Sequence, residues 1–97
     1  MNHIFQALTD PTRREIVRLL KQRDMTAGEL AEHFPLAKST LSAHFNVLRS
    51  AGLIVYERQG TSLVYSLNVS AFEEALSAVM ELFQVGKPAR RRKERRA

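Results

Sequence analysis

Two short helical patterns, joined by a few residues, occupy the stretch from Thr26 to Leu53 and constrain the fold more than any other feature. Thr26 followed by Glu29 fits a capping box, in which each side chain satisfies a backbone N–H at the start of a helix. Apolar residues then recur at the spacing of one helix face: Ala27, Leu30, Ala31 and Phe34. Pro35 predicts an end at Phe34, because proline lacks an N–H and disfavours helix in the preceding residue.

The second pattern runs from about Lys38 to Ala51, and Gly52 suits the left-handed position that ends a helix. Its buried stripe is formed by Leu41, Phe45 and Leu48. At roughly 100° per residue, the opposite side carries short side chains: Ser39, Ser42, Ala43, Asn46 and Ser50. Short side chains let a helix approach base edges closely. The pair is typical of a helix-turn-helix that reads the DNA major groove, although an ordinary solvated helix face explains this segment taken alone.

Two further helical patterns precede the pair. Asn2–Leu8 is short and rich in apolar residues. Asp10-Pro11 then opens a longer helix, because Asp10 can cap it and proline at the first helical position loses no hydrogen bond. That helix buries Ile16, Leu19 and Leu20. Arg13 and Arg14 lie in its first turn, where positive charge is mildly unfavourable, so a carboxylate or a phosphate could offset them.

After the pair, the period of the pattern changes from helical to alternating. The runs 53–58 and 62–67, on either side of Gln59-Gly60-Thr61, predict a β-hairpin. Ser70 and Glu73 fit another capping box, which opens a last helix. The order of four helices, a hairpin and a helix predicts a winged helix-turn-helix, a mainly α (α+β) fold. A generic small α+β core would explain the elements separately, but not their order together with the polar outer face.

Charge is distributed unevenly along the chain. Residues 86–97 hold seven of the fifteen Lys and Arg and one of the ten Asp and Glu, so residues 1–85 carry eight basic and nine acidic side chains. We therefore expect one winged-helix domain at 1–86, for DNA binding and dimerisation, and a basic disordered tail at 87–97. The tail either binds phosphates and increases non-specific affinity, or only solubilises the chain.

Composition argues against several classes of protein. There is no run of about 18 apolar residues to span a membrane, and the N-terminus lacks the basic start and apolar core of a signal peptide. Without cysteine there is no disulfide, thiol sensor or thiolate metal site. No nucleophile, base and acid converge, and no glycine loop cradles a phosphate, so an enzyme is not expected. The sequence predicts a cytoplasmic protein without a cofactor.

Four passages resemble the ArsR-type family of winged-helix repressors, and in particular its SdpR-like branch: Ala7–Arg14, Met25–Ala31, Lys38–Leu48 and Val64–Asn68. The similarity covers about residues 2–85. It implies a bacterial homodimeric repressor that releases DNA on a signal. Many members sense metals, but Ala31, Glu32 and His33 stand where one family site has a cysteine pair, and the last helix lacks the histidine of another. We therefore expect no metal site.

Contacts to DNA are predicted on the second helix of the pair. The first choices for base or phosphate contact are Ser39, Thr40, Ser42 and Asn46. Lys38, at the start of the helix, suits a phosphate. Ala43 stands where family members often have a polar residue, and it offers only a methyl group. His44 suits helix packing as well as DNA contact, and Arg49 suits a phosphate or a solvated helix end.

The wing tip carries the remaining predicted DNA contacts, namely Arg58, Gln59 and Thr61. A wing usually reaches phosphates or the minor groove, where arginine is favoured. Thr61 differs from the basic residue that many relatives carry after the wing glycine, which would weaken the wing's affinity. A plain solvated turn is the alternative interpretation of this tip.

The first and last helices have wider apolar faces than one small core needs. Eight residues are predicted to pack against a second copy: Ile4, Phe5, Leu8, Phe72, Leu76, Val79, Met80 and Phe83. A two-fold dimer would place its recognition helices about 34 Å apart and require an inverted-repeat operator. The predicted function is a dimeric repressor. Its inducer is a small molecule, a protein or membrane partner, or there is no inducing ligand at all. The alternatives are a protein-interaction module and a non-specific architectural DNA-binding protein.

Overall fold

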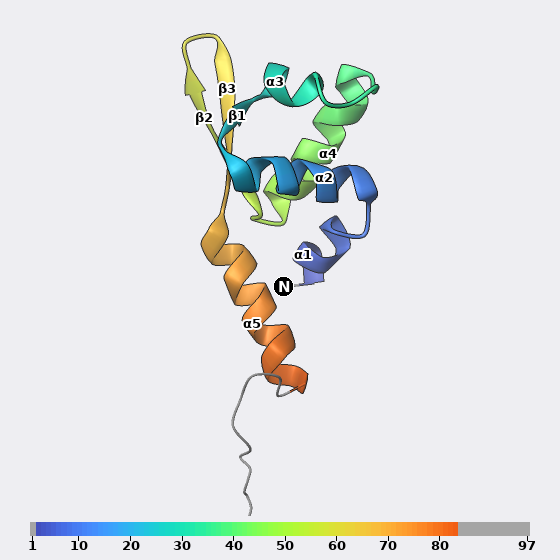
Figure 1. The fold of residues 1–97 in the computed structure, drawn as a ribbon, viewed down its shortest axis with the longest axis vertical. Helices are drawn as coiled ribbons and strands as arrows, with labels where there is room; N and C mark the ends of the chain where they lie inside the picture. Colours follow the sequence, from blue (N-terminus) through green and yellow to red (C-terminus); the bar gives the residue numbers. More distant parts are fainter. Residues whose placement is uncertain (1, 84–97) are drawn as a thin grey trace, which may run out of the picture.

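The computed structural model describes residues 2–83 and confirms the predicted mainly helical winged fold. Its helices are α1 (Asn2–Ala7), α2 (Pro11–Gln22), α3 (Ala27–Ala31), α4 (Lys38–Ser50) and α5 (Val69–Phe83). Its strands are β1 (Met25–Thr26), β2 (Ile54–Gln59) and β3 (Ser62–Leu67). The hairpin of β2 and β3 projects at one end of the molecule, and α5 leads away at the other (Figure 1). The tail expected at 87–97 lies outside the described residues. Within residues 2–83, no helix is long and apolar enough to cross a membrane.

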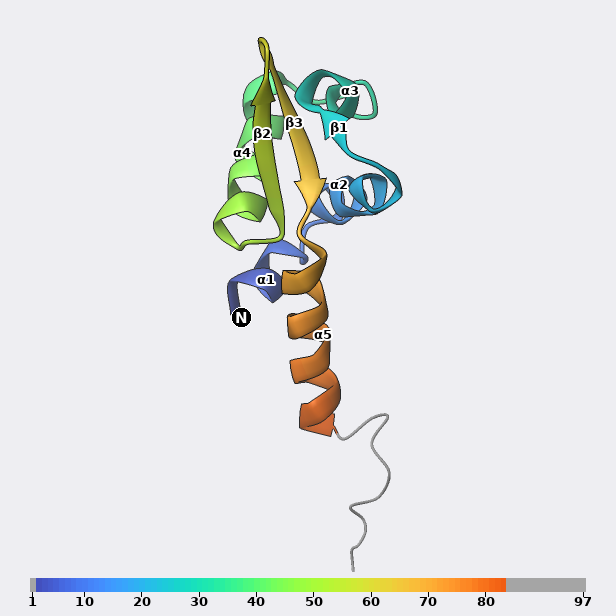
Figure 2. The ribbon, with the colours of Figure 1, turned by 90° about the vertical axis from the view of Figure 1, so that its left-hand side faces the viewer.

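The sheet contains a strand that the sequence did not predict. β1 pairs antiparallel with β3, with Met25 opposite Tyr65, so the strand order is β1-β3-β2 (Figure 2). A two-residue strand is too short to leave a periodic signal, and its partner lies forty positions away in the chain. β2 and β3 pair as predicted around a two-residue turn, in which Gly60 has a φ of +64°. Gly52 also has a positive φ, +81°, which confirms its predicted role after α4.

The predicted starts of α2 and α3 are confirmed. The Asp10 carboxylate accepts from the Arg13 backbone N–H at 3.1 Å. In α3 the capping box is complete, since Glu29 N–H donates to Thr26 Oγ1 at 3.0 Å and Thr26 N–H donates to Glu29 Oε1 at 2.9 Å.

The predicted end of α3 is wrong by three residues, because the helix stops at Ala31 rather than Phe34. The backbone N–H of His33 donates to Leu30 O at 3.0 Å, and that of Phe34 donates to Ala31 O at 3.2 Å. These bonds span three residues instead of four, so the chain tightens into a turn ahead of Pro35.

The predicted cap of the last helix is also wrong, because Asn68 rather than Ser70 precedes α5. Asn68 Oδ1 accepts from the Ala71 N–H at 3.4 Å, while its Nδ2 donates to Gly52 O at 3.0 Å. The backbone N–H of Asn68 donates to Leu53 O at 2.8 Å. One residue therefore caps α5 and ties the start of this helix to the loop that follows α4.

We expect Asn68→Ala to reduce the free energy of unfolding by about 1–3 kcal/mol, because it removes a helix cap and leaves a part-buried carbonyl without its donor. Asn68→Asp keeps the acceptor and loses the donor, so its loss should be smaller. Urea unfolding followed by circular dichroism, at one fixed protein concentration, measures both. An alanine variant as stable as the wild type would contradict this role.

The core fixes α4 against the rest of the domain. The largest fully buried side chains come from α2, α3, α4 and the start of the hairpin: Ile16, Leu30, Leu48, Leu53 and Ile54. In α5, by contrast, Ala75 is the buried residue, and most of the large apolar side chains are exposed. Buried side chains thus anchor the helix-turn-helix in the core, whereas α5 leaves large apolar side chains uncovered within the single chain.

Candidate nucleic-acid interface

Helix α4 presents a polar face to solvent because its apolar stripe is anchored in the core. Leu41, Phe45 and Leu48 are buried, as predicted. The predicted contact residues on the other side are exposed: Lys38, Ser39, Thr40, Ser42, Ala43, Asn46 and Arg49. Ala37, which precedes the helix, makes no side-chain cap bond. The first N–H groups of α4 could therefore be satisfied by an anion near Lys38.

A row of aromatic rings links the hairpin to the outer side of α4. The guanidinium carbon of Arg49 lies 4.3 Å from the centre of the Tyr56 ring, a cation–π contact. Tyr56 meets the edge of Tyr65 at 5.8 Å between ring centres, and Tyr65 packs on Phe45 at 4.7 Å. Arg49 Nη1 also donates to Asn46 Oδ1 at 3.4 Å. The hairpin thus orients Arg49 beside Asn46, a link that sequence patterns did not indicate.

His44 lies against α2 rather than on the open face of α4. Its side chain is 17% exposed. Its Nδ1 atom lies 3.2 Å from Arg13 Nη1 and 3.8 Å from Asp10 Oδ2. Of the two interpretations of His44, the geometry favours packing between helices.

The charges in this corner lower the pKa of Asp10. Burial raises the pKa of the Asp10 carboxyl, but the hydrogen bond from the Arg13 backbone N–H and the nearby positive charge, that of Arg13 and that of His44 when its ring is protonated, outweigh it. The carboxylate therefore stays ionised, and it caps α2 in that form.

Arg13 and Arg14 both donate to backbone carbonyls at the end of α1. Arg13 Nε donates to Ala7 O at 2.6 Å, and Arg14 Nη1 donates to Leu8 O at 2.9 Å. Both cations therefore sit at the C-terminal end of α1, where the free carbonyls carry partial negative charge. Their cost in the first turn of α2 is offset by the helix before it.

The wing tip and the start of α4 lie at the same end of the molecule (Figures 1 and 2). Arg58, Gln59 and Thr61 are exposed at this tip. Arg58 and Gln59 end β2, Thr61 belongs to the two-residue turn, and Gln59 pairs with Ser62. The predicted wing contacts and the beginning of the polar helix could thus meet one extended ligand.

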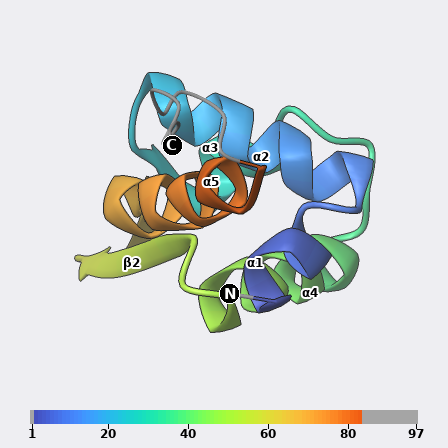
Figure 3. The same ribbon diagram turned by 90° about the horizontal axis from the view of Figure 1, so that it is seen from below.

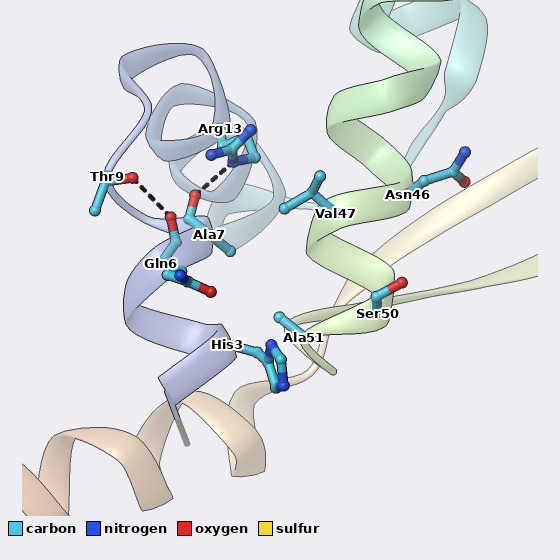
Figure 4. Close-up of a pocket in the computed structure, with 9 residues that line it drawn as sticks. All are labelled: His3, Gln6, Ala7, Thr9, Arg13, Asn46, Val47, Ser50 and Ala51. Carbon is cyan, nitrogen blue, oxygen red and sulfur yellow. Dashed lines mark hydrogen bonds between the residues drawn. The ribbon is translucent and has the colours of Figure 1, made fainter.

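Helix α1 borders the other side of the polar face. His3 and Gln6 of α1 lie across from Val47 of α4 and Ala51, which follows this helix, in an open groove of about 520 Å³ (Figure 4). The lining of this groove also includes Arg13, Asn46 and Ser50. Sequence patterns did not reveal this groove, because its two sides lie some forty residues apart. Among residues 2–83, no cluster of three or more His, Cys, Asp or Glu side chains could hold a metal ion.

The predicted dimer residues divide into exposed and internal groups. Phe5, Phe72, Leu76, Met80 and Phe83 are exposed, with Leu76 at 50% and Phe83 at 69%. Val79 is half-buried. Ile4, however, lies in the core of the single chain at 8% exposure, and Leu8 packs against that core. Ile4 and Leu8 thus contribute to the core of the single chain. The exposed residues Phe5, Phe72, Leu76, Met80 and Phe83 of α1 and α5 are here called the apolar face.

Comparison with known families and sequences agrees with this geometry. A family model described as the bacterial regulatory protein, arsR family, matches residues 10–56. The transcriptional repressor SdpR of Bacillus subtilis (strain 168) is 42% identical over 86 residues, which cover 89% of this chain and 96% of SdpR.

Two solved structures described as ArsR-type regulators have a similar fold. An ArsR-like transcriptional regulator from Rhodococcus sp. RHA1 superimposes with a TM-score of 0.78 at 25% identity, covering 86% of this chain and 78% of the other. A homodimeric winged helix-turn-helix DNA-binding domain from Mycobacterium bovis superimposes with a TM-score of 0.68 at 28% identity, covering 82% and 76%.

Proposed function

Because this chain belongs to the ArsR family of bacterial transcriptional regulators, whose winged helix-turn-helix binds DNA, we propose that it is a dimeric repressor of a palindromic operator. The observation that carries the proposal is the exposed polar face of α4, held on a buried stripe and continued by the wing tip. Repression follows from occupying a promoter in the cytoplasm and blocking access of the polymerase.

In this proposal α4 enters the major groove. Ser39, Ser42 and Asn46 lie on its outer side and have the short polar side chains that hydrogen-bond to base edges. Lys38 and Arg49 meet phosphates on either side, and the wing residues Arg58, Gln59 and Thr61 follow the backbone or the minor groove. Thr40 and Ala43 complete the surface.

The apolar face is proposed to pair two copies. Exposed phenylalanine, leucine and methionine side chains on α1 and α5 are costly in water, and burying each large one contributes about 1.5–3 kcal/mol. A two-fold interface brings the same face of each copy together. The M. bovis domain, which has a similar fold, is described as homodimeric.

The basic tail is proposed to contribute affinity without sequence preference. Seven of the fifteen basic side chains lie in residues 86–97, and residues 1–85 have a slight acidic excess. Removing residues 87–97 is expected to flatten the plot of log affinity against log salt, because fewer counterions are released from DNA. Fluorescence anisotropy from 50 to 300 mM KCl, on operator and scrambled duplexes, measures this slope. An identical slope for both proteins would exclude the tail from the mechanism.

Selection of tight-binding duplexes from a random pool tests the proposed function. The expected result is an inverted repeat with half-site centres one helical turn apart, about 10 base pairs, bound by two copies of the chain. Footprinting on the region upstream of the protein's own gene should reveal such a repeat. A protein that enriches no sequence and binds all duplexes alike would be architectural. One that binds no DNA with or without the tail would be a protein-interaction module.

A further inference from the structure

Three side chains meet where α1 ends, α2 begins and α4 passes. Arg13 reaches from the first turn of α2 to Ala7 O of α1 at 2.6 Å, and to His44 Nδ1 of α4 at 3.2 Å. Asp10 Oδ2 lies 3.8 Å from the same His44 nitrogen. Helix α1 packs against α4 in this region (Figure 3). One guanidinium thus bonds directly to both helices.

The chemistry of arginine fixes the state of His44 in this cluster. A guanidinium has donors only and stays charged, so His44 Nδ1 has to accept. An accepting Nδ1 requires a neutral imidazole that carries its proton on Nε2. If His44 takes up a proton, Nδ1 becomes a donor that faces another donor, and the bond to Arg13 is lost. Asp10, 3.8 Å away, then becomes the attractive partner of the ring.

We propose that Arg13 and His44 are positioning residues, which hold α4 at the angle at which its outer face fits DNA. This inference rests on the proposed function. Arg13 ties α4 to the end of α1, and α1 carries Phe5 of the apolar face. This contact of Arg13 with both helices, here called the joint, therefore fixes how the apolar face is oriented relative to the recognition helix α4. In a dimer, an error in this angle displaces both helices from their half-sites.

A consequence is that operator affinity falls when His44 is protonated. The charged or titratable groups that face His44 from α2 are Asp10 and Arg13. On α1, His3 lines the groove to which Arg13 also contributes. A histidine that touches a phosphate directly would give the opposite sign, because its protonation strengthens binding. The direction of the pH profile thus distinguishes positioning from contact.

The test compares the full chain with His44→Asn, His44→Leu and Arg13→Lys on the selected operator, by fluorescence anisotropy between pH 5.5 and 8.0. Asparagine can place an oxygen acceptor near the position of Nδ1 and does not titrate. Wild-type affinity should fall about tenfold towards pH 5.5. His44→Asn should bind within about twofold of the wild type at pH 8 and show a flatter profile. His44→Leu and Arg13→Lys should bind about tenfold more weakly at pH 8.

If the affinities of the wild type and of His44→Asn depend on pH in the same way, the positioning role of Arg13 and His44 is overturned, whereas the proposed function is not. A wild-type affinity that rises at low pH, and does not rise in His44→Asn, would also overturn this positioning role and assign His44 to DNA contact. A wild type that binds no duplex at any pH would overturn the proposed function, and the joint's role with it. Thermal unfolding of each variant at both pH extremes separates these outcomes from loss of fold.

Discussion

Asn46→Ala is expected to weaken operator binding by at least about 30-fold. A bidentate contact between asparagine and adenine contributes roughly 1–3 kcal/mol of discrimination, and a two-fold dimer loses this contact in both half-sites. The combined loss of about 2–6 kcal/mol corresponds to a factor between roughly 30 and 10⁴. Asn46 is exposed on α4, so its truncation should leave the fold intact. The Arg49 guanidinium keeps its contact with Tyr56.

The matched control is Gln22→Ala, which truncates an exposed amide at the far end of α2. Affinity is measured by anisotropy on the selected operator and on duplexes substituted at one base pair. The Asn46 variant should lose discrimination at the base it reads, whereas the control should keep both affinity and discrimination. If the Asn46 variant binds within twofold of the wild type and prefers the same bases, then Asn46 does not read DNA.

Short-range signals predicted the starts of α2 and α3 correctly, because the residues that give each signal lie within one helical turn of each other. The capping box of Thr26 and Glu29 joins residues three apart, and Asp10 caps a helix that begins at the next residue. Gly52 takes the left-handed conformation that few other residues adopt readily. Each of these depends on local sterics or on hydrogen bonds between residues a few positions apart, so neighbouring residues contain the necessary information.

Long-range partners were not predictable from local patterns. The pairing of Met25 with Tyr65 joins residues forty positions apart. The spacing of Ser70 and Glu73 fits a capping box as well as that of Thr26 and Glu29 does. In the structure, however, the cap is Asn68, which follows β3 and also donates to the Gly52 carbonyl. The second bond of Asn68, to the carbonyl of Gly52, comes from a loop outside α5, so no sequence pattern within this helix could indicate it.

In the candidate site, too, local patterns predicted some features correctly and could not predict the contacts between distant residues. Helical periodicity alone placed Ser39, Ser42 and Asn46 on the exposed side of α4, as the structure has them. Periodicity also marked Ile4 as apolar, but it could not distinguish the chain's own core from a second copy as the surface that covers it. Similarly, the position of Arg13 on α2 was clear, whereas its contact with His44 depends on how α2 and α4 cross.

Leu76→Glu, a change on the apolar face, is expected to split the proposed dimer and to weaken operator binding at least about a hundredfold. Leu76 is half-exposed in the single chain, so glutamate costs the monomer little. In a two-fold interface the same substitution buries a carboxylate from each copy, and burial of unpaired charge is strongly unfavourable. Each half-site must then be bound without the gain that comes from linking the two.

Ser77→Glu is the matched control, since it adds the same charge at the next position on the polar side of α5, beside Glu73, Glu74 and Glu81. Light scattering should give twice the chain mass of 11.0 kDa for the wild type and for Ser77→Glu, and a single chain mass for Leu76→Glu. Only Leu76→Glu should lose tight operator binding, while retaining weak binding to DNA. If Leu76→Glu stays dimeric, the dimer interface does not include this part of α5. Another surface would then have to hold the two recognition helices at the spacing of the operator.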